Sequence, residues 1–292
     1  MSAWLPGAPC TPRACIDGAG ASAAAVVRGV LRLTAVAALI LTGVLLSPFG
    51  PRLPAAAVRR WCRWIVRAAG VRVRITGGAA PTGGLLLVAN HISWLDIPLL
   101  AAVRPARMLA KREIRQWPVA GALASRGAVF IDRDRLRTLP ATVAQLAEVL
   151  RAGAAVGVFP EGSTWCGRAQ GRFRRAAFQA ALDADVPVQP VRIRYRLTDG
   201  TPTTRPAFVG DDSLLASVWR VVTTRNVTAE VDVRPAVPSG AHLDRRSLAR
   251  AAEHGTVGGG PTAHPHTGSP TPPRTSDGQR ADGSRARYAS LR

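Results

Sequence analysis

The chain has 292 residues, of which 39 are basic and 18 acidic; its formal net charge is +21, and 47% of its residues are hydrophobic. This apolar content excludes a disordered polycation, and the length suffices for one large domain or two small ones. The charge indicates a polyanionic partner, for which nucleic acid, anionic lipid and phosphorylated substrates are the candidates. The four cysteines show no C-x-x-C pair and no cysteine–histidine metal spacing, so we expect no disulfide scaffold, no metal site and a reducing compartment.

The N-terminal quarter of the chain carries an apolar segment between arginines. Residues 1–22, rich in glycine, alanine and proline, are predicted to be a disordered N-terminus. Residues 23–69 are predicted to hold a membrane-inserted apolar helix followed by a basic amphipathic one. Residues 33–51 carry no charge, but their apolar run, residues 33–46, is shorter than the ~20 residues of a full membrane span, although residues 24–30 could extend it with tilt. A buried helix and a signal-peptide core fit the same pattern. The basic flanks favour insertion into a membrane or burial at its interface.

Residues 55–69 are predicted to form a basic amphipathic helix. Arg59, Arg60, Arg63 and Arg67 fall within one arc of that helix, and the opposite side is apolar. Such a helix suits an anionic membrane surface, or it packs its apolar face on its own domain, and both can hold at once. These arginines follow the apolar segment, which predicts that the rest of the chain lies on the cytoplasmic side of the cell membrane.

Residues 70–240 alternate between short β-rich runs and helical patterns. Strands are predicted at 71–76, 85–89, 107–110, 128–132, 154–159, 186–195 and 226–233. Helices are predicted at 94–103, 117–126, 138–151, 173–184 and 243–253. The alternation predicts a layered α/β domain with a mostly parallel or mixed sheet flanked by helices. Residues 254–292 are predicted to be a disordered tail.

His91 is the one histidine inside the α/β region, and only Asn90 separates it from the apolar strand at 85–89. Such strand ends are where α/β sheets usually place their chemistry. Asp96 lies five residues on, so the two side chains can meet only if His91 lies in the turn and Asp96 begins the helix. The carboxylate would then fix the tautomer of the imidazole and leave its other nitrogen as a base for a substrate hydroxyl. A buried histidine bonded to a backbone carbonyl is the alternative.

Two further turns follow predicted strands. Gly162 begins a spacing of glycines like that of a P-loop, but the lysine and hydroxyl residue that nucleotide binding needs are missing, and there is no G-x-S-x-G elbow for a hydrolase. This segment could instead face an anion with its backbone N–H groups and with the side chains of Glu161, Ser163 and Thr164. An ordinary turn is the alternative. Arg133, after the strand at 128–132, offers a fork for phosphate oxygens or forms a solvated pair with its neighbouring aspartate.

Together these segments resemble the glycerophospholipid acyltransferase superfamily, best known for the 1-acyl-sn-glycerol-3-phosphate (lysophosphatidic acid) acyltransferases. The resemblance rests on four blocks in the family's order: N-H-x4-D at 90–96, G-x-x-F-I-D-R at 127–133, F-P-E-G-S at 159–163 and V-P-V-Q-P at 186–190. It implies an acyltransferase fold and acyl transfer from acyl-CoA or acyl carrier protein to the hydroxyl of 1-acyl-sn-glycerol-3-phosphate, giving phosphatidic acid for phospholipid biosynthesis.

The resemblance also implies roles for residues. His91, oriented by Asp96, would be the catalytic base. Arg133 and the turn of Glu161, Gly162, Ser163 and Thr164 would bind the acceptor's phosphate and glycerol. No metal and no bound cofactor would be required, and the partners would be a membrane lipid acceptor, the acyl donor and an anionic membrane surface, with no nucleic acid.

One departure concerns the acceptor. Lysophosphatidate enzymes usually carry an arginine after the third block, where this chain has Thr164 and Trp165. The pattern is also similar to relatives that acylate lyso-ornithine lipid, so an O-acyltransferase for another lysolipid is the alternative. A nucleic-acid-binding protein would explain the charge, but no RRM, zinc-finger or helix-turn-helix signature supports it.

Overall fold

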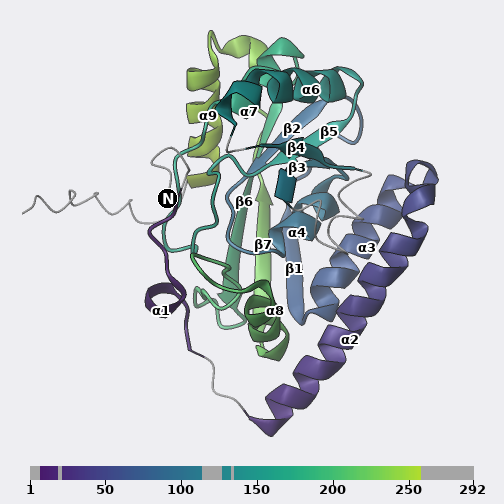
Figure 1. Cartoon of the computed structure of the whole chain (residues 1–292), viewed down its shortest axis with the longest axis vertical. Coiled ribbons are helices and arrows are strands. Elements are labelled where there is room, and N and C mark those ends of the chain that lie inside the picture. Colours follow the sequence, from purple (N-terminus) through teal and green to yellow (C-terminus); the bar gives the residue numbers. More distant parts are fainter. Residues whose placement is uncertain (1–6, 19–21, 114–126, 133–134, 258–292) are drawn as a thin grey trace, which may run out of the picture. The chain divides into compact units, whose positions relative to one another are not determined.

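A mixed β-sheet forms the centre of the fold (Figure 1). The computed structural model describes residues 7–18, 22–113, 127–132 and 135–257. In these residues seven strands pair in the order β1-β7-β6-β2-β5-β3-β4. The strands are β1 (Val71–Thr76), β2 (Leu85–Ala89), β3 (Arg107–Lys111), β4 (Val129–Ile131), β5 (Ala155–Val158), β6 (Val188–Leu197) and β7 (Val227–Val233). The predicted strands are thus confirmed, β1 and β2 at their predicted bounds.

The direction of the strands makes the sheet mixed. The five strands from β6 to β4 pair in parallel, β7 pairs antiparallel with β6, and β1 pairs parallel with β7. The central strand β2 is buried along its whole length, since β5 and β6 flank it and helices cover both of its faces. The predicted layered α/β fold with a mixed sheet is therefore confirmed.

Helices pack against the sheet in two layers. The helices are α1 (Pro12–Cys15), α2 (Ala23–Leu46), α3 (Ala55–Ala68), α4 (Asp96–Val103), α6 (Leu139–Arg151), α7 (Ala176–Asp183), α8 (Leu214–Thr223) and α9 (Arg245–Val257), with 3-10 turns η1 (Ser47–Arg52), η3 (Leu136–Thr138) and η4 (Ser239–Ala241). Apolar side chains of α6, α7 and α9 form one core with β2, β5 and β6, and those of α3, α4 and α8 form another on the opposite face.

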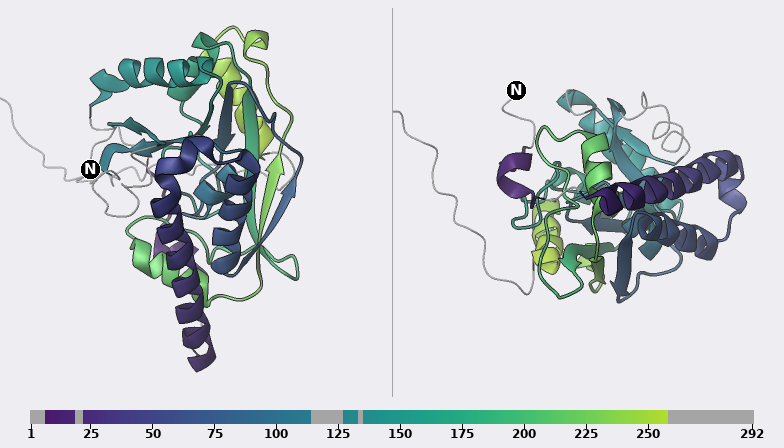
Figure 2. Two further views of the ribbon diagram at one scale, coloured as in Figure 1. Left: turned by 90° about the vertical axis from the view of Figure 1, so that its right-hand side faces the viewer. Right: turned by 90° about the horizontal axis from the view of Figure 1, so that it is seen from below.

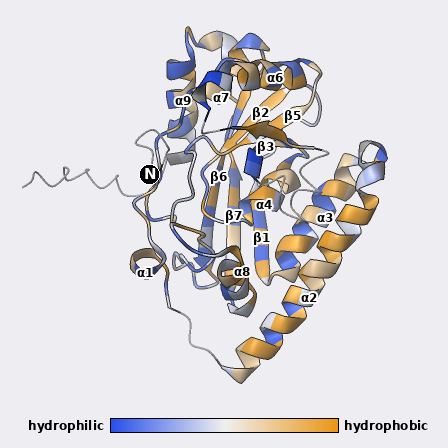
Figure 3. Cartoon of the chain, in the orientation of Figure 1, coloured by the Kyte–Doolittle hydropathy of each residue, from blue (hydrophilic) through white to orange (hydrophobic). Residues whose placement is uncertain are grey.

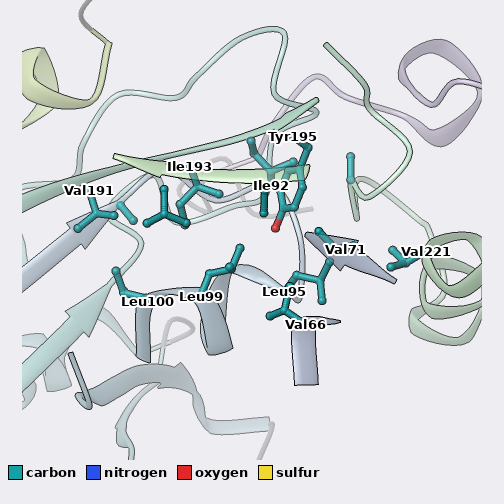
Figure 4. Packing of buried hydrophobic residues seen from close by; sticks show 14 of the residues in the cluster. Val66, Val71, Ile92, Leu95, Leu99, Leu100, Val191, Ile193, Tyr195 and Val221 are labelled. Carbon is teal, nitrogen blue, oxygen red and sulfur yellow. The ribbon is translucent and has the colours of Figure 1, made fainter. Parts of the chain in front are cut away.

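Alternation along β2 shows how one strand feeds both cores. Leu85 and Leu87 point into the α4 core, whereas Leu86 and Val88 point into the α6–α7–α9 core. Figure 4 shows the first of these cores, in which leucines of α4 face Ile193 and its neighbours on β6. These cores hold the carboxyl ends of the parallel strands in place.

The helices depart from prediction in two places, and one predicted helix is not tested. The helix α8 falls where no helix was predicted, α9 continues to Val257, beyond the predicted start of a disordered tail, and the helix predicted at 117–126 lies outside the described residues. Ser213 caps α8 by accepting a hydrogen bond from the Ala216 N–H, and the buried side of α8 packs on the sheet, which explains a helix in a stretch rich in β-branched residues.

The helices α2 and α3 lie side by side along one side of the sheet (Figures 1 and 2). Cys62, Ile65 and Val66 of α3 are buried. The packing of the apolar face of α3 on its own domain is thus confirmed. The helix α2 is long and apolar enough to cross a membrane by length and composition (Figure 3). Most of its side chains are exposed.

Residues 7–18 contradict the prediction of an unstructured N-terminus. They carry the short helix α1, and Cys10 is buried. Asp17 pairs with Arg168 at 2.9 Å and accepts a hydrogen bond from the backbone N–H of Thr204 at 2.9 Å. Composition alone suggested disorder, but these contacts with segments more than 150 residues away hold the N-terminal segment on the domain.

Candidate active site

The candidate site lies at the carboxyl ends of two neighbouring parallel strands. His91 follows β2, and the loop of residues 159–171 follows β5, which pairs with β2. The backbone N–H of Trp165 donates to the His91 carbonyl at 2.8 Å, and the side chain of Phe159 stacks on the imidazole with ring centroids 4.0 Å apart. The fold therefore brings the predicted first and third blocks together.

His91 and Asp96 meet as the sequence predicted. Nδ1 of His91 lies 2.9 Å from Oδ2 of Asp96, which is the first residue of α4. The same Oδ2 accepts hydrogen bonds from the backbone N–H groups of Ile92 at 2.6 Å and Ser93 at 2.8 Å. The chain thus wraps around the buried carboxylate between strand and helix, which brings two residues five positions apart into contact.

Tyr195 completes the surroundings of Asp96, and sequence reasoning missed it. Its hydroxyl donates to Oδ1 of Asp96 at 2.6 Å. Burial and the Asp96 charge raise the pKa of Tyr195 well above 10, so the phenol stays a neutral donor. The alternation of β6 could have indicated it, since it places Tyr195 on the same buried face as Ile193. A buried tyrosine hydroxyl needs a hydrogen-bond partner, and this would have pointed to a polar group nearby.

The imidazole of His91 is partly accessible. Its side chain is 20% exposed, whereas that of Asp96 is fully buried. With Nδ1 directed at Asp96, Nε2 is the nitrogen left for a substrate. The backbone of the neighbouring Asn90 is anchored as well, since its side-chain amide exchanges two hydrogen bonds with the backbone of Ile193 on β6.

Glu161 links the His91 segment to the loop that follows β5. Its side chain is buried, with Oε2 accepting from the His91 N–H at 2.7 Å and Oε1 from the Gly171 N–H at 3.0 Å. Each oxygen thus has a backbone donor, and Glu161 positions His91 and the loop; its contact with the acceptor stays a prediction.

Burial raises the pKa of Glu161 from 4.5 to about 8. The two N–H donors lower it, and the nearby charges of Asp96 and Glu253 raise it further. Desolvation prevails because the described surroundings offer this carboxylate neutral donors in place of a cation at hydrogen-bond distance.

The other predicted ligands lie on the same loop or outside the described residues. Gly162 has a φ of +76°, which turns the chain after Glu161, and Ser163 and Thr164 are half-buried beside it. Arg133 lies outside the described residues, although the strand β4 that precedes it is present at the far edge of the sheet.

Comparison with known proteins gives the class. The family model described as Acyltransferase matches residues 71–194. The lyso-ornithine lipid O-acyltransferase of Pseudomonas aeruginosa is 39% identical over 218 residues, which are 73% of this chain and 80% of that protein. This chain belongs to the glycerophospholipid acyltransferase superfamily and is an acyltransferase.

Two further relatives show the range of the family. The 1-acyl-sn-glycerol-3-phosphate acyltransferase of Neisseria gonorrhoeae is 37% identical over 56% of this chain and 65% of its own length. The crystal structure of the 1-acyl-sn-glycerophosphate acyltransferase PlsC from Thermotoga maritima matches with a TM-score of 0.59 at 19% identity, covering 79% of this chain and 92% of that one. The second likeness supports the fold.

Proposed function

We propose that this enzyme transfers an acyl group from acyl-CoA or acyl carrier protein to the free hydroxyl of a lysolipid. The observation that carries the proposal is the contact of 2.9 Å between His91 Nδ1 and a buried, four-times hydrogen-bonded Asp96 carboxylate. This arrangement leaves Nε2 as a base at the partly open end of a parallel strand.

In the proposed reaction Nε2 of His91 takes the proton of the acceptor hydroxyl as its oxygen attacks the thioester carbonyl carbon. The carbon–sulfur bond then breaks, and the leaving sulfur takes the proton from the imidazolium. The negative charge of Asp96 stabilises the imidazolium in between, and Tyr195 holds the second oxygen of that carboxylate. The acyl group passes directly to the acceptor without an acyl-enzyme.

For the acceptor, 1-acyl-sn-glycerol-3-phosphate is the first candidate, with phosphatidic acid as product. It is supported by the block that ends at Arg133, an arginine that the resemblance assigns to the acceptor's phosphate, and by the relatives named for that reaction. Lyso-ornithine lipid is the second. It is favoured by the Pseudomonas relative and by the loop after Ser163, which lacks the arginine that lysophosphatidate enzymes usually carry there. Trp165 packs on Gly171 in this loop, and its first arginine, Arg168, is paired with Asp17.

The attachment of α2 to the domain bears on how the enzyme meets the membrane. Arg28 donates to the carbonyl of Thr223, and Arg32 donates to the carbonyls of Val222 and Thr224, at the C-terminal end of α8. Residues 33–46 follow these anchors; Val36 is buried on the domain, and most of the other side chains are exposed. At ~1.5 Å per residue this run extends only ~21 Å, short of a ~30 Å hydrocarbon core.

We therefore propose that α2 enters one leaflet beside α3 with the catalytic domain on the cytoplasmic face. The exposed Arg60, which lies 5.5 Å from the Trp64 ring, together with Arg63 and Arg67, would contact anionic headgroups. Epitope tags at both ends of the chain, digested in sealed inverted and right-side-out vesicles, test this. Both tags should be cut from the cytoplasmic face only, and tags cut from opposite faces would show that α2 spans the membrane.

The reaction is tested with membrane fractions, labelled acyl-CoA and either lysophosphatidate or lyso-ornithine lipid. The native enzyme should acylate one acceptor, and His91→Ala should abolish transfer. His254→Ala, which changes an exposed histidine on α9, is the matched control and should keep full activity. Equal transfer by the native protein and His91→Ala would refute the base assignment, and the acceptor that is used decides between the two candidates.

A further inference from the structure

Three of the four cysteines meet in space although they are far apart in sequence. The sulfur atoms of Cys10, Cys15 and Cys166 all lie within 4.8 Å of one another. Cys10 and Cys15 come from the N-terminal segment, and Cys166 lies on the loop that follows Glu161. Spacing along the chain hid this cluster, because the third sulfur comes from a segment that only the fold brings near.

The N-terminal segment is seated on the domain so that the sulfurs face one another. Cys10 and Cys166 are buried, and Cys15 is half-buried beside them. Asp17 clamps the segment two residues after Cys15 through Arg168 and Thr204. Gly210, at φ +61°, leaves room for the Cys10 backbone, since a Cβ there would lie 2.8 Å from the Cys10 carbonyl oxygen.

The chemistry of the donors selects the ligand. Three sulfurs bound to one ion at ~2.3 Å would lie ~3.8 Å apart in tetrahedral geometry, which the 4.8 Å limit accommodates. Thiolates prefer soft ions such as Zn²⁺ to the oxygen-seeking Mg²⁺ and Ca²⁺. Binding would release the thiol protons and leave a fourth position for water.

We propose that Cys10, Cys15 and Cys166 form a site for one thiophilic metal ion, Zn²⁺ or a similar ion, which ties the N-terminal segment to the loop beside His91. The backbone N–H of Trp165, the residue before Cys166, donates to the His91 carbonyl. The ion would therefore stiffen the wall of the active site from outside, and the proposed acyl-transfer step does not pass through it.

The first test is a Co²⁺ titration of the full-length, detergent-solubilised protein after treatment with a chelator and a reductant. We expect one Co²⁺ per chain, with the near-ultraviolet thiolate-to-cobalt charge-transfer band, displaced by Zn²⁺. Cys10→Ser and Cys15→Ser should weaken binding at least tenfold. Cys62→Ser, at the buried cysteine of α3, is the control and should bind as the native protein does.

A second pair of variants keeps every thiol. Gly210→Ala pushes a Cβ against the Cys10 carbonyl, whereas Gly200→Ala has a similarly positive φ of +89° and open space around it. Only Gly210→Ala should weaken Co²⁺ binding. The proposal is overturned if binding is equal in the native protein and the Cys10 and Cys15 variants, or if mapping of the untreated protein shows a disulfide within the cluster and elemental analysis finds no bound metal.

Discussion

Asp96 has two roles that substitutions should separate: its hydrogen bonds hold residues 91–95 in place, and its negative charge stabilises a positive charge on His91. In Asp96→Asn the amide oxygen can take the place of Oδ2 and accept all three of its N–H partners. The amide NH2 then replaces Oδ1, and the Tyr195 hydroxyl, which rotates freely, can accept from it instead of donating. All four contacts of residue 96 can persist, so the main losses are the negative charge and the acceptor of the Tyr195 O–H.

The magnitudes follow from these contacts. A carboxylate and an imidazolium whose charge centres are about 4 Å apart attract by about 4 kcal/mol at an effective dielectric constant of about 20. Losing this in the transition state lowers kcat about 10³-fold. Asp96→Ala in addition leaves the buried N–H groups of Ile92 and Ser93 unpaired, at about 1–3 kcal/mol each, so it should lose about 2–6 kcal/mol of folding stability, against about 1 kcal/mol for Asp96→Asn.

The assay combines kcat and KM for the acceptor that is used with the free energy of unfolding from urea titrations. Tyr195→Phe is the matched variant for the second oxygen: it keeps the ring in the core and should lower kcat about tenfold with KM unchanged. An Asp96→Asn enzyme with more than a third of native kcat would show that the charge is not required. Equal losses of stability in the asparagine and alanine variants would refute the inferred exchange of partners.

Two further predictions concern Glu161 and the packing of α2. Because the pKa of Glu161 is raised to about 8, the folded state keeps a proton that the unfolded state releases. The free energy of unfolding should therefore fall as the pH rises, by up to roughly 1.4 kcal/mol per pH unit between about pH 4.5 and 8. In urea titrations across this range, Glu161→Gln should show a smaller fall of this free energy with pH, and an equal fall would assign the effect to another group. A Cβ on Gly43 would lie 2.2 Å from the Trp61 ring, so Gly43→Ala should cost about 1–3 kcal/mol and lower the Tm, whereas Gly50→Ala, with open space around it, should not.

Local patterns in the sequence determined most of the sheet and the placement of His91 and Asp96. The alternation of β1 and the unbroken apolar run of β2 predicted both strands at their bounds, because periodicity reports which faces of a strand are buried. The position of His91 at the end of β2, with Asp96 at the start of a helix, followed from the same local signals. Strand ends and helix starts are set by neighbours in sequence, which is why this part of the site could be predicted.

Tertiary structure alone decided what the remaining groups contact. Tyr195 reaches Asp96 across 99 residues of chain, Glu161 accepts from two distant backbone N–H groups, and Cys166 meets two cysteines of a segment whose composition predicted disorder. Periodicity states that a side chain is buried but not which distant partner satisfies it. That partner depends on strand order and on loop packing, both of which arise only when the sheet is assembled.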